Sequence, residues 1–118
     1  HIVPTVAYLI KEGEKEFLYV GDMHYSSGFW EEINSRTNNL QGIIIETSFP
    51  NRLSKLAESS GHLTPMQLEK EIRNLKKPVP LYIFHMKPMF IEEIVEEIYS
   101  IDYAERIKVL NQEDIIEI

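Results

Sequence analysis

Apolar residues fall in short runs that charged or turn-forming segments separate. Val3–Ile10 and Phe17–Val20 are rich in β-branched and aromatic residues, a composition typical of strands. Between them, Lys11–Lys15 is a charged turn with Gly13 at its middle. So short a connection predicts an antiparallel hairpin.

After Gly21 the periodicity becomes helical. Phe29, Trp30 and Ile33 recur at helical spacing and predict a helix over Gly28–Arg36, with both aromatic side chains in the core. Gly42–Ile45 is a continuous apolar run, which is typical of a strand buried on both faces.

The second half of the chain alternates in the same way. Thr64 and Pro65 form a helix start, with Gln67 at the capping-box position, and the apolar spacing predicts that this helix runs through Leu75 and stops near Lys77. The other elements expected here are helices over Asn51–Ser59 and from Pro88 through Ile98, and strands over Leu81–Phe84, Ile107–Leu110 and Ile115–Ile118.

This order predicts one α/β domain. Helical crossovers join the strands that end at Val20, Ile45 and Phe84, so these three strands are expected to run parallel in one sheet. The 118 residues contain no internal repeat and no low-complexity tract.

Composition narrows the possible functions. Acidic residues outnumber basic ones 19 to 12, and this disfavours a general binder of nucleic acid or of anionic membranes. The absence of cysteine excludes disulfides, thiol nucleophiles and thiolate metal sites, so any metal must be held by His, Asp and Glu. No apolar run approaches the ~20 residues that span a bilayer. The protein is expected to be cytoplasmic, with no membrane partner.

Titratable side chains follow the expected parallel strands. Asp22, Glu46 and His85 each come directly after one of them, and His62 precedes the helix that starts at Thr64. Parallel strands place their carboxyl ends on one edge of a sheet, where open α/β sheets bind ligands. The set is suited to a metal held by nitrogen and oxygen, such as Zn, Mn or Fe. The same residue types also serve as turn formers and helix caps at strand ends.

Local sequence around these residues resembles the metallo-β-lactamase superfamily. Tyr19–Asp22 is similar to its strand and Gly-Asp step, and Glu46–Phe49 to its E-x-x-F segment. Gly61–Thr64 is similar to its His-x-Thr step, and Tyr82–His85 to the strand that delivers its last metal-binding His. The connecting segments narrow the resemblance to class II cyclic-nucleotide phosphodiesterases, over most of His1 to Ile98.

The resemblance implies a binuclear centre of two divalent ions, with Zn favoured and Mn or Fe as alternatives. His1, Asp22 and His85 would be metal ligands, although a leading His is also a common remnant of an expression tag. His62 would protonate the leaving group or contact a phosphate; otherwise it caps a helix or faces solvent. Glu46 would orient the His62 ring or relay its proton; otherwise it caps the loop. Lys87 would either contact a phosphate or simply lead into the following helix.

The family's His-x-His-x-Asp-His motif does not occur in these residues. The chain therefore resembles the C-terminal half of a metallo-β-lactamase-type αββα sandwich, and the missing N-terminal half and a second copy of the chain are expected partners. The expected activity is hydrolysis of 3′,5′-cyclic nucleotides, cyclic AMP or cyclic GMP, by the intact protein. Two alternatives remain open: an RNase Z-like or other phosphodiester hydrolase, and a non-catalytic interaction module.

Overall fold

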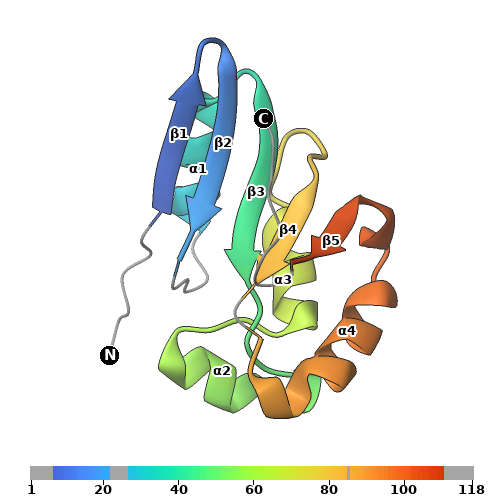
Figure 1. Cartoon of the computed structure of the whole chain (residues 1–118). Helices are drawn as coiled ribbons and strands as arrows, with labels where there is room; N and C mark the ends of the chain where they lie inside the picture. Colours follow the sequence, from blue (N-terminus) through green and yellow to red (C-terminus); the bar gives the residue numbers. More distant parts are fainter. Residues whose placement is uncertain (1–6, 22–26, 85, 111–118) are drawn as a thin grey trace.

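The computed structural model describes residues 7–21, 27–84 and 86–110, and these residues form a mixed sheet with helices packed against it (Figure 1). The sheet order is β1-β2-β3-β4-β5. The strands are β1 (Ala7–Glu12), β2 (Lys15–Val20), β3 (Leu40–Glu46), β4 (Leu81–Phe84) and β5 (Ile107–Val109). The helices are α1 (Ser27–Arg36), α2 (Ser54–Ser60), α3 (Pro65–Ile72) and α4 (Ile91–Tyr99), with short 3-10 turns η1 (Asn51–Leu53), η2 (Pro88–Phe90) and η3 (Ala104–Arg106). The α/β class expected from the sequence is thus confirmed.

Strand directions follow the sequence-based prediction. β1 and β2 form an antiparallel hairpin in which Ala7 pairs with Val20 and Glu12 with Lys15. β2, β3 and β4 are parallel neighbours, and β5 extends the parallel part of the sheet. The strand expected over Ile115–Ile118 lies outside the described residues.

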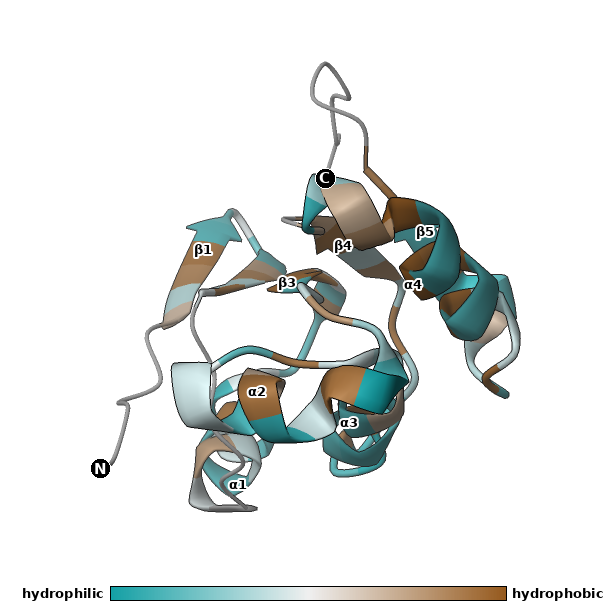
Figure 2. Ribbon diagram, turned by 90° about the horizontal axis from the view of Figure 1, so that it is seen from below, coloured by the Kyte–Doolittle hydropathy of each residue, from teal (hydrophilic) through white to brown (hydrophobic). Residues whose placement is uncertain are grey.

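The core lies between one face of the sheet and the helices. Figure 2 shows α1, α2 and α3 together below the sheet, and α4 lies next to α3. Alternation along the strands sends one set of side chains into this core. The fully buried aliphatic strand residues are Leu18, Val20, Ile43, Ile45, Leu81 and Ile83, and Trp30 of α1 and Ile94 of α4 pack in the same cluster.

The opposite face of the sheet carries aromatic rings. The centroids of Phe17 and Tyr82 lie 5.8 Å apart, from strands on either side of β3. A Cβ added to Gly42 of β3 would come within 2.8 Å of the Phe17 ring, so only glycine leaves room for this packing. Ile44 on this face is only partly buried, and the expectation of a strand buried on both faces is wrong at this position.

Helix α3 starts where the sequence predicts but ends earlier. The Thr64 hydroxyl accepts a hydrogen bond from the Gln67 N–H, and the Gln67 side chain accepts one from the Thr64 N–H, which together form a capping box. The helix ends at Ile72 rather than beyond Leu75. A tertiary contact explains the difference, because the Asn34 side chain of α1 donates to the Asn74 carbonyl at 2.7 Å and holds it in a turn.

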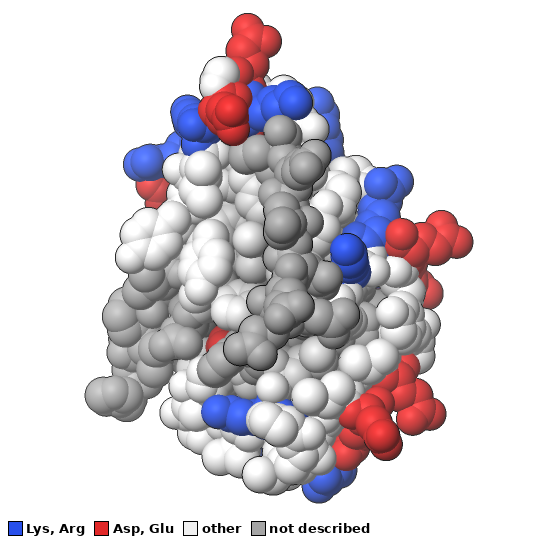
Figure 3. Space-filling view, in the orientation of Figure 1, with Lys and Arg blue, Asp and Glu red and all other residues white. Residues whose placement is uncertain are grey.

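Charge is unevenly spread over the surface. Figure 3 shows acidic side chains gathered over α4, whose sequence carries Glu92, Glu93, Glu96 and Glu97. The surface at the left of that view, beside β1 and β2, is mostly uncharged where it is described. Tyr8 and Ile10 of β1 are 61% and 48% exposed. None of the helices in the described ranges has the length and apolar character that a bilayer crossing requires.

Candidate functional site

Three loop segments meet at the carboxyl ends of β3 and β4. The Thr47 N–H donates to the Phe84 carbonyl at 3.2 Å, which continues the β3–β4 pairing by one residue. The Ser48 N–H then donates to Leu63 O at 3.1 Å, and the Ser48 carbonyl accepts from the Lys87 N–H at 3.3 Å. Ser48 therefore ties the end of β3 to the loop before α3 and to the segment before α4.

A left-handed glycine delivers His62 to this edge. Helix α2 ends at Gly61, which has φ 77°, a conformation that residues with a Cβ rarely adopt. The next N–H, that of His62, donates to the Ala57 carbonyl at 2.8 Å and closes the helix. The chain then turns toward the sheet, and the His62 side chain reaches the last residue of β3.

Glu46 and His62 form a carboxylate–imidazole pair at the end of β3. Nδ1 of His62 contacts Oε1 of Glu46. The His62 side chain is 17% exposed and the Glu46 side chain is 3% exposed. The second carboxylate oxygen, Oε2, accepts a hydrogen bond from the Ser48 hydroxyl at 3.3 Å. The Glu46 carboxylate accepts a hydrogen bond from Nδ1. Nε2 is therefore the ring nitrogen through which His62 would exchange a proton with a ligand.

The structure excludes one alternative role for His62. Thr64 is the N-cap of α3, so His62 does not cap this helix. His62 is also mostly covered, and this disfavours a purely solvated loop residue. Glu46 and His62 are the expected catalytic residues; both lie within the described ranges, and the structure brings them together.

Phe49 connects this pair to two cationic side chains. Its ring centroid lies 5.9 Å from that of His62 and 6.2 Å from that of Phe90. The Lys87 ammonium lies 5.9 Å from the Phe49 ring, and the Arg52 guanidinium lies 5.4 Å from the Phe90 ring. Positive charge therefore borders a site in a chain of formal net charge −7.

The expected metal ligands His1, Asp22 and His85 all lie outside the described residues. Within residues 7–21, 27–84 and 86–110, no three His, Asp or Glu side chains form a group that could hold a metal ion. The described donors at this edge are Glu46 and His62, which are engaged with each other. A carboxylate paired with an imidazole is suited to proton transfer beside a metal as well as without one.

A second buried carboxyl lies inside the core and was missed from the sequence. Glu71 of α3 is 1% exposed, and its Oε1 accepts a hydrogen bond from the Trp30 indole N–H at 2.6 Å. Burial raises the pKa of Glu71, and the Trp30 bond opposes this in part. The signal was present in the spacing, because Glu71 falls between Leu68 and Leu75 on the apolar stripe of the predicted helix.

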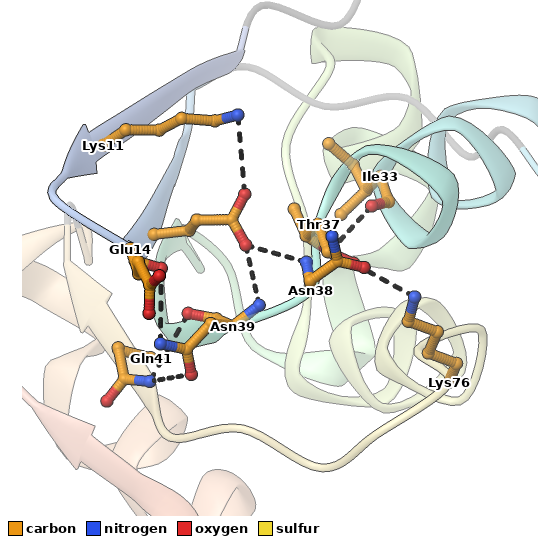
Figure 4. A network of polar contacts seen from close by, with 9 residues as sticks. Lys11, Glu14, Ile33, Thr37, Asn38, Asn39, Gln41 and Lys76 are labelled. Atoms are coloured by element: carbon orange, nitrogen blue, oxygen red, sulfur yellow. Dashed lines mark hydrogen bonds and ion pairs between the residues drawn. The ribbon is translucent and has the colours of Figure 1, made fainter.

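A third carboxyl, that of Glu16, lies near the start of β2, at the opposite end of the parallel strands. Figure 4 shows its neighbours Lys11, Asn38 and Asn39. It accepts hydrogen bonds from the N–H groups of Asn39 at 2.7 Å and Asn38 at 2.8 Å, and Lys11 lies 3.7 Å away. These backbone bonds, that of Asn39 first, hold the pKa of Glu16 below its ordinary value. The network fixes the loop between α1 and β3 to the start of β2, which is a structural role.

No protein-family model matches the chain, and no curated protein matches it.

Proposed function

We propose that this chain belongs to a metal-dependent phosphodiesterase of the metallo-β-lactamase superfamily that hydrolyses 3′,5′-cyclic nucleotides to 5′-nucleotides. The observation that supports the proposal most is the contact between Glu46 and His62 at the carboxyl edge of a parallel sheet. These residues are 16 positions apart and belong to the two segments whose sequences resemble the family's Glu and His-x-Thr steps.

The proposed cofactor is a pair of divalent ions, with Zn as the first choice and Mn or Fe as alternatives. His1, Asp22 and His85 are the residues proposed to hold them, because neutral imidazole and carboxylate are common ligands of these metals. When bound, such ions offset the charge of a phosphoryl group and lower the pKa of a water molecule.

The described residues of the site are proposed to deliver one proton, to the leaving 3′ oxygen. During hydrolysis the oxygen of water forms a bond to phosphorus and its proton passes to solvent, while the bond from phosphorus to the 3′ oxygen breaks; a proton from solvent returns to His62 between turnovers. Protonated His62 gives the proton on Nε2 to the departing 3′ oxygen. Glu46, which accepts from Nδ1, stabilises the positively charged ring and fixes its orientation. Ser48 holds the Glu46 carboxylate in place through Oε2.

The proposed partners follow from the same resemblance. A segment that carries the His-x-His-x-Asp-His motif would supply further metal ligands, and a second copy of the chain is a further proposed partner. A cyclic nucleotide is the proposed small-molecule ligand.

The test is cyclic AMP hydrolysis by the intact protein, meaning the protein with every residue that its gene encodes, with added Zn or Mn. Asp22→Ala and His85→Ala are expected to abolish turnover. Asp102→Ala is a matched control, because Asp102 is exposed and adjoins Tyr103, whose hydroxyl contacts Val79 before the start of β4. Absence of turnover, or full activity in both ligand variants, would contradict the proposal. Cleavage of an RNA 3′ trailer without cyclic AMP turnover would favour the RNase Z-like alternative.

A further inference from the structure

Lys87 is a half-buried cation held close to the Glu46–His62 pair. Its N–H donates to the carbonyl of Ser48, whose hydroxyl donates to Glu46. Its ammonium lies 5.9 Å from the Phe49 ring, and the same ring lies 5.9 Å from His62. Both the backbone and the side chain of Lys87 are therefore fixed against residues of the candidate site.

A second cation nearby provides an informative contrast. Arg52 lies over the Phe90 ring and also forms an ion pair with Glu93, with a distance of 2.9 Å between Nε and Oε2. Lys87 forms no such pair with any carboxylate in the part of the chain that the structure describes. The charge of Arg52 is thus compensated by Glu93, whereas no carboxylate among residues 7–21, 27–84 and 86–110 compensates the charge of Lys87.

The contact with Phe49 is too weak to be the main interaction of the Lys87 ammonium. A cation–aromatic contact at a partly exposed position contributes little energy compared with a charge-assisted hydrogen bond. An ammonium on a long, partly covered stem is a point charge that donates hydrogen bonds to phosphate oxygens from several directions. Its position beside Phe49 places this charge at the same edge of the sheet as the proton donor His62.

We propose that Lys87 binds the anionic oxygens of the phosphate group that the Glu46–His62 site acts on. The inference rests on the proposed function for the identity of the substrate, but binding of a phosphate can be measured without turnover. Removing the charge should weaken binding of the anion more than it slows the proton transfer from His62.

The experiment measures binding of inorganic phosphate to the intact protein by calorimetry, and KM and kcat for cyclic AMP, with Zn present. Lys87→Met keeps the aliphatic stem over Phe49 and removes the charge. It is expected to weaken phosphate binding and raise KM about 10- to 100-fold, with a smaller change in kcat. Lys87→Arg keeps the charge and should retain most of the binding.

Arg52→Met is the matched control, since it removes a cation that also lies over an aromatic ring but is already paired. It is expected to bind phosphate as the wild type does, and equal thermal midpoints verify that the variants are folded. Unchanged phosphate binding in Lys87→Met, or no binding by the wild type, overturns the inference. Lys87-dependent phosphate binding without cyclic AMP turnover would instead sink the proposed function and leave this inference standing.

Discussion

Two buried carboxyls in this protein each contact the N–H of an aromatic ring, yet only one of them is suited to chemistry. Glu71 accepts from the Trp30 indole inside the core, and Glu46 contacts the His62 imidazole at the edge of the sheet. The two glutamates are almost equally covered, at 1% and 2% exposure. An indole N–H only donates, whereas an imidazole gains and loses a proton near neutral pH. Burial of a carboxyl therefore does not by itself mark a functional site.

The surroundings of the two carboxyls differ as well. Glu71 lies on the apolar stripe of α3, and the low polarity there raises its pKa. Glu46 lies at the end of a strand, where it also accepts from the Ser48 hydroxyl. One carboxyl joins two helices in the core, and the other orients a titratable ring at the edge where three loop segments meet.

The same Glu→Gln substitution at positions 46 and 71 tests whether the two carboxyls differ in function. Glu46→Gln is expected to lower kcat for cyclic AMP about 100-fold, because an amide does not stabilise the imidazolium as a carboxylate does. Its thermal midpoint should change little, since the amide has nearly the shape of the carboxyl. Glu71→Gln is the matched control and should leave kcat unchanged.

Equal kcat values in Glu46→Gln and wild type would contradict this prediction. They would mean that the Glu46–His62 pair, like the Trp30–Glu71 pair, has only a structural role.

Glu71→Gln is expected to have a smaller effect, on the free energy of unfolding and its dependence on pH. The pKa of folded Glu71 is raised above the ordinary value of 4.5, so its contribution to stability is fully present below about pH 4.5 and is lost as the pH rises through the folded pKa. The variant should match the wild type at pH 4 and be more stable at pH 8. The expected gain is about 1.4 kcal/mol for each pH unit by which the folded pKa of Glu71 exceeds its ordinary value. Urea unfolding at both pH values measures this, and a less stable variant at pH 8 would contradict it.

Much of the fold follows from local sequence. The charged turn between two apolar runs specified the hairpin, and the Thr64–Gln67 capping box specified the start of α3. The end of α3 could not be predicted, because it depends on the Asn34 side chain reaching Asn74 across 40 residues of sequence. Local patterns identify where elements begin, whereas tertiary contacts decide where this helix stops.

The candidate site was predicted only in part. A Glu and a His near predicted strand and helix ends were sufficient to expect Glu46 and His62 at one edge of the sheet. The role of Ser48 as the residue that joins three loops depends on backbone hydrogen bonds that leave no mark on residue type. Asp22, His85 and His1 remain predictions, since they lie outside the described residues.

The proposed proton transfer from His62 to the leaving group can be tested by comparing two substrates. The intact protein and its His62→Gln variant are assayed with Zn on cyclic AMP and on bis(p-nitrophenyl) phosphate, whose leaving group departs without a proton. We expect kcat for cyclic AMP to fall about 10²- to 10⁴-fold in the variant, and kcat for the nitrophenyl ester to fall far less. Equal losses on both substrates, or no loss on cyclic AMP, would contradict the proposed proton transfer.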